Sequence, residues 1–558
     1  MANLSRLTAF LFLIIAGCPT SKSNQEAEKS SIASCSTIKK LDRAQRLVCR
    51  LLHHQDAAQR KAAAESLGEL GRSGPSARVI MNNKADPDRA AVAIPALIKA
   101  LRDKDTEVRQ AAAHALERMG QRAAAAVPAL VDALDNNPEL SPFVANALGA
   151  IGTKASAAIP SLAAKMREKN PRQQYLYAWT LAQIGPKSLP PLTKALKDRD
   201  ATLQKLAADA LGRMGLGAEP ALSDLALLVG HKNESLRVSA LSAFASICST
   251  GMGMFKKVGL CDKDRVDRLK PVIEKGLEDG SPSVLNAAAR SVGALGIVDA
   301  AMIPALTKIL AEHPDKEGRR NAAESIGWMG PEALSSVPAL KNALSDPDEH
   351  VRTYAAWALG RIGSQARASV DALLRRAKAS TDQEREVAID AIGKIGGGAA
   401  SAFPYVLELF KGKDERLSRL AAAVLPRISP KGTPVLVQGL GSRDARVRAD
   451  CAWALGSLGQ KAEGVSAALV KSLNDPQDSV RYAAAQALGE IGASSSIPAL
   501  QESLKDSDTG VKTAVIDALG KMGRRAASAR AMIEPLEKSD DEQVREAAKR
   551  ALKLIPGR

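Results

Sequence analysis

The sequence predicts an all-α protein, an α-α superhelical solenoid of about fifteen two-helix repeats. Three observations predict it. Aromatic residues make up only 3% of the 558 residues, whereas a strand-rich protein would need more aromatic and β-branched residues. The apolar residues are mostly Ala, Leu, Ile and Val, and Ala and Leu have the best helix propensities. A five-residue motif recurs along the chain at a mostly regular spacing.

The recurring motif is Leu-Gly-x-Ile-Gly with its variants, called the Leu-Gly motif below. Twelve clear copies run from 67–71 (LGELG) to 519–523 (LGKMG). Three degenerate copies stand at 244–248, 425–429 and 552–556. Most successive copies lie 30 to 34 residues apart, which is the length of two short helices and their turns.

Each repeat follows one pattern, shown well by residues 337–363. Val337-Pro338 places a proline in the first turn of a helix, where its missing N–H costs nothing. Asp346-Pro347-Asp348 predicts a turn whose Asp caps the next helix. Val351-Arg352 opens this second helix, and Gly363 after it suits a left-handed C-cap.

These proline, aspartate, Val-Arg and glycine features resemble the HEAT-repeat family, in the short form also found in phycobilisome-lyase-type repeats. The resemblance covers the expected folded body, 39–558, with insertions near 72–92 and 249–268. Each insertion either contacts a partner or is tolerated extra length. The resemblance also implies that the Arg after each Val forms a ladder with the turn Asp of an adjacent repeat. Such arrays serve many roles, so the resemblance is specific for fold and not for function.

The N-terminal residues resemble a bacterial lipoprotein signal. Arg6 precedes the apolar stretch 7–15 (LTAFLFLII), which is too short to span a bilayer. Ile15-Ala16-Gly17-Cys18 resembles a lipobox, in which cleavage before the Cys is followed by lipidation of its thiol. We expect a signal peptide at 1–17, lipidation at Cys18 and a flexible polar tether at 18–38. The alternative is an ordinary signal peptide that contains a Cys.

Four other cysteines form two pairs with twelve residues between the members, Cys35 with Cys49 and Cys248 with Cys261. An exported chain permits disulfides, and each pair would close a short loop. The alternative is four free, partly buried thiols. Cys451 lies in an Ala-rich helical pattern and is expected to be a small core residue.

One stripe of the second helix is expected to point outward. If the motif leucine is position 0 and faces the core, position −2 is 200° away on the helix. Three of the four tryptophans occupy position −2, namely Trp179, Trp357 and Trp453. Position +2, on a nearby stripe, holds Trp328 and six cations, Arg118, Arg213, Arg361, Lys394, Arg427 and Lys521.

In HEAT repeats the second helix lines the concave face, so the resemblance places these stripes in a groove. Trp and Arg are favoured in binding hot spots. The sequence therefore predicts a groove that binds a protein or peptide. The alternative is that each Trp covers small neighbours at a repeat junction, and Tyr354 and Tyr482 fit either arrangement.

The sequence favours a non-enzymatic, lipid-anchored scaffold outside the cytoplasm, in the periplasm or at the cell surface. None of its six His forms a His-Glu-x-x-His motif or a His-Glu pair, and Gly-x-Ser-x-Gly is absent. We expect no cofactor, no metal and no nucleic acid partner, and a monomer. The 78 Lys and Arg against 61 Asp and Glu favour an acidic or mixed partner. The alternatives are binding of an anionic polymer or membrane surface, and bilin-lyase-like or chaperone-like activity.

Overall fold

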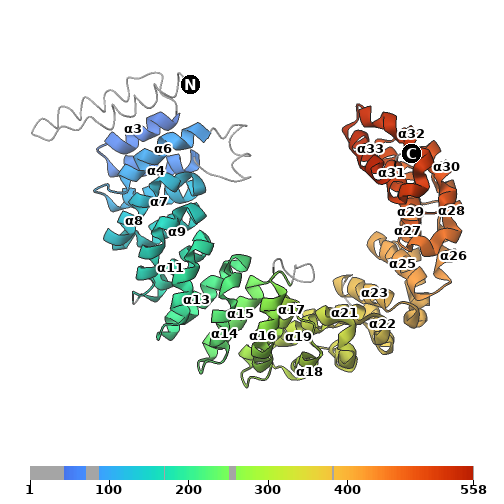
Figure 1. The fold of residues 1–558 in the computed structure, drawn as a ribbon, viewed down its shortest axis with the longest axis horizontal. Coiled ribbons are helices and arrows are strands. Elements are labelled where there is room, and N and C mark those ends of the chain that lie inside the picture. Colours follow the sequence, from blue (N-terminus) through green and yellow to red (C-terminus); the bar gives the residue numbers. More distant parts are fainter. Residues whose placement is uncertain (1–42, 71–86, 169, 250–258, 380–381, 557–558) are drawn as a thin grey trace, which may run out of the picture. The chain divides into compact units, whose positions relative to one another are not determined.

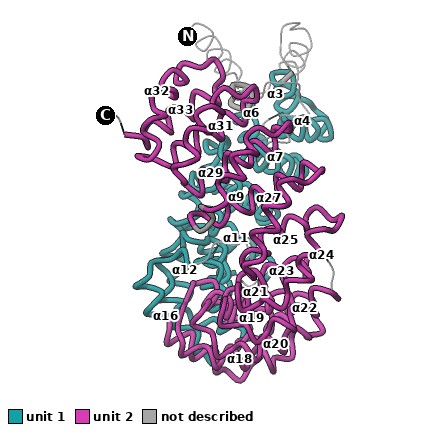
Figure 2. The backbone as a smooth tube through the Cα atoms, turned by 90° about the vertical axis from the view of Figure 1, so that its right-hand side faces the viewer, with its two compact units in different colours: residues 1–269 teal, residues 270–558 magenta. Residues whose placement is uncertain are grey.

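The computed structural model describes residues 43–70, 87–168, 170–249, 259–379 and 382–556. These residues form helices and connecting turns, with no strand among them. The chain divides into two compact units, residues 1–269 and 270–558, and the boundary falls inside helix α16 (Lys263–Leu277). Figure 1 labels the helices and Figure 2 separates the two units by colour.

The described helices pair into fifteen repeats, each with a first and a second helix. In unit 1 the first helices are α3 (Arg43–His53), α6 (Pro87–Ala100), α8 (Val127–Asn136), α10 (Ile159–Lys165), α12 (Leu189–Leu196) and α14 (Leu222–Val229). The second helices are α4 (Ala57–Leu70), α7 (Thr106–Met119), α9 (Ser141–Ile151), α11 (Pro171–Ile184), α13 (Ala201–Arg213) and α15 (Glu234–Ile247).

Helix α16 is followed along the chain by α17 (Pro282–Leu295), and eight repeats follow in unit 2. Their first helices are α18 (Ile303–Glu312), α20 (Val337–Ala343), α22 (Val370–Ala379), α24 (Phe403–Lys411), α26 (Gly432–Gly439), α28 (Ser466–Ser472), α30 (Ile497–Ser503) and α32 (Arg530–Ile533). Their second helices are α19 (Lys316–Met329), α21 (Glu349–Ile362), α23 (Asp382–Ile395), α25 (Glu415–Ile428), α27 (Ala445–Gly456), α29 (Asp478–Ile491), α31 (Thr509–Met522) and α33 (Glu542–Leu554). The predicted all-α solenoid of about fifteen two-helix repeats is confirmed.

Within each unit, second helices of neighbouring repeats pack directly on one another, as α4 does on α7 and α27 on α29. The first glycine of the Leu-Gly motif makes this approach possible. A Cβ on Gly68 would lie 2.9 Å from the Cα of Ala115, and one on Gly456 only 2.6 Å from the Cα of Ala487. Both distances are shorter than real Cβ contacts, so these positions require glycine.

The closing glycine of the motif has positive φ, as expected, but its full conformation corrects the prediction. Gly492 is left-handed, with φ 69° and ψ 21°. Gly330 instead has φ 62° and ψ −133°, a region essentially confined to glycine. The difference arises because a 3-10 helix, η8 (Gly330–Ser336), follows at once and leads into α20. The same link recurs at η1 (Gly120–Ala126), before α8.

The expected arginine ladder is present, and it uses the turn aspartates as predicted. Arg448 donates from Nε and Nη2 to the two carboxylate oxygens of Asp475, at 2.7 and 2.8 Å. Arg481 binds Asp506 in the same way, at 2.7 and 2.9 Å. Charge-assisted pairs of this forked geometry are strong. They lower the pKa of Asp475 and of Asp506, through these hydrogen bonds first.

The ladder is not uniform. Arg352 pairs with Glu384 of α23 rather than with an Asp, through Nη2 at 2.6 Å. Arg109 likewise pairs with Glu139, at 2.8 Å. Helix caps are separate from the ladder: Asp348 accepts from the backbone N–H groups of His350 and Val351 at 3.0 and 3.2 Å. In the Asp346–Asp348 turn, Asp346 thus serves the ladder by binding Arg319 at 2.7 Å, and Asp348 serves the cap.

The cysteines divide into described and undescribed positions. Cys248 and Cys261 form a disulfide with their Cα atoms 5.1 Å apart. Cys451 is buried as a free thiol, and burial raises its pKa to about 12. Cys18 and Cys35 lie outside the described residues, so the lipidation site and the pair expected for Cys49 are not described.

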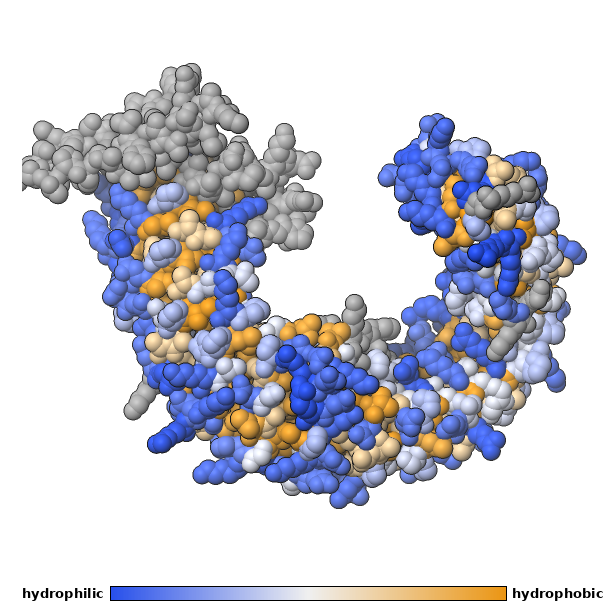
Figure 3. Space-filling view, in the orientation of Figure 1, coloured by the Kyte–Doolittle hydropathy of each residue, from blue (hydrophilic) through white to orange (hydrophobic). Residues whose placement is uncertain are grey.

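The two expected insertions overlap regular helices. Residues 71–86 lie outside the described part, but α6 already begins at Pro87, so Pro95 stands inside a helix rather than at its start. Residues 250–258 also lie outside it, and α16 begins at Lys263. In the described part of the chain no helix is long and apolar enough to cross a membrane. Much of the face in Figure 3 is hydrophilic, with hydrophobic residues between the polar ones.

Candidate functional site

The candidate site is the second-helix face, the outward side of the second helices carrying positions −2 and +2 of the Leu-Gly motif. Because successive second helices pack on one another within each unit, side chains at these positions meet across repeat junctions. The structure shows which of the predicted aromatic and cationic residues actually come together.

In unit 1, Trp179 and Arg213 meet across the α11–α13 junction. The guanidinium carbon of Arg213 lies 3.8 Å from the centre of the Trp179 ring, and Arg Nη2 donates to the hydroxyl of Tyr175 at 2.8 Å. Tyr175 is itself 46% exposed. The three side chains form a cation–π cluster in which Tyr175 and Arg213 are exposed and Trp179 is partly buried.

Tyr175 was not predicted as a member of this face. It stands at position −6, the position that Tyr482 occupies in α29. Extending that register to the other repeats would have found it. Tyr482 accepts a hydrogen bond from Gln486 at 2.8 Å and joins no aromatic pair among the described residues.

In unit 2, Trp328, Trp357 and Arg361 gather across the α19–α21 junction. The two indole rings pack edge to face with centroids 5.2 Å apart. The guanidinium carbon of Arg361 lies 5.8 and 5.9 Å from them. Trp357 also covers Gly327 of the preceding repeat so closely that a Cβ there would lie 2.2 Å from its Cζ3. This geometry matches the alternative in which a Trp covers a small neighbour.

Glu324 corrects the expectation that position −2 always points outward, because it is buried. Large aromatic neighbours explain this. Tyr354 lies near it, and burial first and the charge of Glu324 second raise the pKa of Tyr354 to about 12. Tyr354 also packs edge to face on Trp357, with centroids 6.2 Å apart.

Trp453 differs from the other tryptophans. It is 46% exposed and makes no ring or cation–π contact within the described part of the chain. Arg427, at position +2 of the preceding repeat, is exposed and makes no ion pair with any described residue. Neither residue has a role in the fold that these contacts reveal.

The remaining predicted cations are paired with carboxylates. Lys394 binds Asp390 on its own helix at 2.6 Å, and Lys521 binds Glu490 of the preceding second helix. Arg118 binds Glu69, again one repeat earlier. The +2 stripe is therefore largely neutralised at these three places, and it does not form a continuous row of free positive charge.

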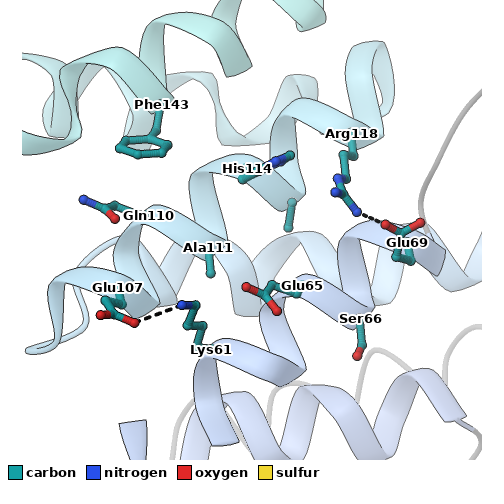
Figure 4. A pocket seen from close by; sticks show the side chains of 11 residues that line it. Lys61, Glu65, Ser66, Glu69, Glu107, Gln110, Ala111, His114, Arg118 and Phe143 are labelled. Atoms are coloured by element: carbon teal, nitrogen blue, oxygen red, sulfur yellow. Dashed lines mark hydrogen bonds and ion pairs between the residues drawn. The ribbon is translucent and has the colours of Figure 1, made fainter. Parts of the chain in front are cut away.

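A pocket around Arg118 lies between α4 and α7, with Phe143 of α9 at its edge (Figure 4). The Lys61–Glu107 pair, at 2.9 Å, stands at one end and the Arg118–Glu69 pair at the other. Glu65 and His114 lie between the pairs. Among the described residues, no group of three or more His, Cys, Asp or Glu side chains has an arrangement that would hold a metal ion.

Comparisons with known proteins agree with this architecture. The family model described as HEAT repeats matches residues 77–141, 94–172, 159–245, 303–393, 403–479 and 466–553, more than half of the chain. No curated protein matches the sequence.

Several solved structures share the fold. A structure of yeast importin-β is 14% identical with a TM-score of 0.53, covering 98% of this chain and 78% of that one. A second importin-β structure is 14% identical with a TM-score of 0.55, covering 96% and 81%. A structure on Kap95p binding to RanGDP is 13% identical with a TM-score of 0.54, covering 96% and 86%. At such low identity the likeness extends to the fold alone. On the matched repeats, this chain belongs to the HEAT-repeat family.

Proposed function

We propose that this chain is a protein-binding scaffold whose second-helix face holds a partner protein or an extended segment of one. The observation that carries the proposal is the surface cluster of Tyr175, Trp179 and Arg213, in which the exposed Arg213 stacks on the partly buried indole 3.8 Å away. Tyr, Trp and Arg are the residues most enriched in binding hot spots. Kap95p, which shares the fold at 13% identity, binds the protein RanGDP.

The pattern of charges supports a protein partner over an anionic polymer. A polyanion is held by rows of free cations whose attraction falls with salt. On this face Arg118, Lys394 and Lys521 are paired with carboxylates. The isolated aromatic–arginine clusters fit separate side chains of a folded or extended protein better than they fit a uniform polymer.

The scaffold is further proposed to be lipid-anchored through Cys18 and to lie outside the cytoplasm. The sequence of residues 1–18 motivates the anchor. The disulfide between Cys248 and Cys261 is consistent with an oxidising compartment.

Affinity capture from membranes tests the binding function. Wild type is compared with a Trp179→Ala/Trp453→Ala variant, which removes two tryptophans of the second-helix face. The matched control replaces three exposed apolar residues away from that face, Leu227, Val298 and Leu334, by Ala. The control should recover the wild-type partner and the Trp variant should lose it. Equal recovery by all three proteins rules the face out.

Membrane fractionation tests the anchor separately. A Cys18→Ser variant should leave the membrane fraction and appear in the soluble fraction. If it remains membrane-bound after a high-salt wash, the anchor is not at Cys18.

A further inference from the structure

One pocket on the second-helix face of unit 2 has features that neither aromatic cluster shares. It lies across the junction of α25 and α27 and encloses about 420 Å³. Trp453 forms one wall, and three arginines and two carboxylates surround it. Its lining, called the Trp453 pocket below, is Glu415, Arg416, Arg419, Leu420, Ala423, Arg446, Asp450 and Trp453.

The apolar part of the Trp453 pocket is open to solvent. Trp453 is 46% exposed, and Leu420 and Ala423 lie beside it on α25. An indole face left uncovered next to two aliphatic side chains is suited to cover an apolar side chain of a ligand. In contrast to Trp357, no neighbouring ring of the described chain occupies it.

The polar part is organised around one buried carboxylate. Asp450 is 2% exposed and accepts from Nε of Arg419 at 2.7 Å. This bond fixes the Arg419 guanidinium, yet the side chain remains 66% exposed. Its two terminal nitrogens make no hydrogen bond with the described residues. Arg419 therefore presents an unoccupied pair of donors to the pocket, oriented by one hydrogen bond to Asp450.

The other two arginines also have donor groups without a good hydrogen bond. Arg416 is 68% exposed and its nearest carboxylates, Asp382 and Glu386, are both 3.6 Å away, beyond good hydrogen-bond distance. Nη1 of Arg446 is buried without a hydrogen-bond partner in the described chain, 3.7 Å from Asp450, while Nε and Nη2 lie 3.4 Å from Glu415 and Asp444. Unsatisfied guanidinium donors at the edge of a pocket favour an incoming acceptor.

The carboxylates around the pocket limit the charge of the anion. Glu415 and Asp450 belong to the lining, and three further carboxylates, Asp382, Glu386 and Asp444, lie 3.4 to 3.6 Å from Arg416 or Arg446. They repel a singly charged carboxylate less than a phosphate group, which brings nearly two negative charges.

We propose that the Trp453 pocket binds an acidic segment of a partner protein, with one Asp or Glu side chain on Arg416 and Arg419. The forked donors of an arginine match a carboxylate. An apolar residue beside that carboxylate covers Trp453 and Leu420. This inference rests on the proposed scaffold function and names the chemistry of the partner at one site.

Binding of peptide libraries tests the proposal. The full chain is immobilised and offered blocked nonapeptides with a fixed central residue and random flanks, the central residue being Glu, Gln or phosphoserine. The Glu library should be retained at least tenfold better than the Gln library, and sequencing should show apolar residues next to Glu. Trp453→Ala and the pair Arg419→Gln/Asp450→Asn should each abolish this preference. The pair is used because Arg419→Gln alone would leave Asp450 buried without its arginine.

Trp179→Ala serves as the matched control, since it changes the same helical position in unit 1 and should leave the Glu preference intact. Equal retention of Glu and Gln libraries, no retention of either, or a preference for phosphoserine would each overturn the proposal. Stronger retention by phosphatidylglycerol vesicles than by the Glu library would point to a membrane surface and also overturn it.

The affinity capture proposed for the binding function distinguishes failure of the Trp453 pocket from failure of the scaffold function. If the Trp179→Ala/Trp453→Ala variant loses its partner while Arg419→Gln/Asp450→Asn keeps both partner and peptide retention, the Trp453 pocket is wrong and the scaffold function stands. If every variant captures the same proteins as wild type, the scaffold function fails as well.

Discussion

Trp357 and Trp453 occupy the same position in their helices, two residues before the motif leucine, yet their surroundings are opposite. Trp357 is half-buried over Gly327 and packs edge to face on Trp328. Trp453 is 46% exposed and lines a pocket together with three arginines. The preceding repeat explains the difference. Before Trp357 it supplies Gly327 and Trp328, and before Trp453 it supplies Pro426 and Arg427.

The comparison teaches that a Trp at this position is not structural or functional by itself. For Trp357 and Trp453 the role follows the two residues after the motif leucine of the repeat before, whereas the corresponding Gly149 before Trp179 is covered by Gln183. Gly327 lets the indole of Trp357 pack on the neighbouring helix, whereas Pro426 and Arg427 leave the indole of Trp453 exposed to solvent. The clear motif IGWMG therefore predicts packing, and the degenerate motif LPRIS predicts an open site.

Replacing Trp357 should give the largest contrast. Trp357→Ala removes a packed ring from the α19–α21 junction, and we expect it to destabilise unit 2 by about 3 kcal/mol. Trp453→Ala should cost less than about 1 kcal/mol because the ring is exposed and unpacked. Urea unfolding followed by far-UV circular dichroism measures both. Equal destabilisation by the two variants would remove the basis of the comparison.

The second prediction concerns the stability of the repeats packed on α27, the helix that carries Trp453. Helix α27 packs on α29, which Arg481 ties to Asp506. At neutral pH, Asp506→Asn should destabilise the chain by about 1.5 kcal/mol, through loss of a charge-assisted pair.

The pH dependence of this effect has a definite sign. The hydrogen bond from Arg481 lowers the pKa of Asp506 below its ordinary value of 3.8. The stabilisation is therefore complete above pH 3.8 and is lost as the pH falls from there through the lowered pKa. Thermal melts of wild type and Asp506→Asn should converge over that acidic range. A difference that persists unchanged at the lowest pH would show that the pair is not its source.

A smaller effect is expected from closing the space beneath Trp357. In Gly327→Ala the added Cβ meets Trp357 Cζ3 and the Cα of Ala358. The resulting overpacking should exceed the helix-propensity gain of alanine, for a net loss of about 1 kcal/mol. Gly280→Ala is the control, because no atom lies within 4 Å of the place that its Cβ would take. In a Trp357→Ala background the penalty of Gly327→Ala should shrink to that of the approach to the Cα of Ala358, and an additive double variant would exclude the contact with Trp357.

The smallest expected effect is on the quenching of tryptophan fluorescence. The chain has four tryptophans, of which Trp453 is the most open to solvent by the contacts described. Trp453→Phe should lower the fraction of fluorescence that acrylamide quenches most readily, and Trp357→Phe should leave that fraction almost unchanged. The reverse order would place Trp357, rather than Trp453, in solvent.

Much of the fold follows from local sequence. Pro338 lies in the first turn of its helix as predicted, because a first turn has no need of its N–H. The ladder from Arg481 to Asp506 was implied by the family pattern. The 3-10 link after Gly330 was not predicted, since its ψ angle depends on the start of the next helix and not on the glycine.

The site was less predictable because it is made between repeats. The position in the helix predicted that Trp179, Trp357 and Trp453 belong to one outward-facing stripe. It did not show that Arg213 would stack on Trp179 or that Glu324 would be buried. Nor did it show that Arg419 would be fixed by Asp450 of the next repeat. These outcomes depend on which side chains two adjacent helices bring into contact.

The close approach of each motif glycine to the following repeat also bears on how such a chain changes in evolution. At the α4–α7, α27–α29 and α29–α31 junctions the same small pair meets, Gly68 with Ala115, Gly456 with Ala487 and Gly489 with Ala518. A recombination event that gains or loses one whole repeat there restores an equivalent contact. At the α19–α21 junction Trp357 lies over Gly327, so an exchanged neighbour without that glycine would collide with the indole. Repeats joined by the Gly–Ala pair are therefore interchangeable at this contact, whereas the repeats of Gly327 and Trp357 must be inherited together.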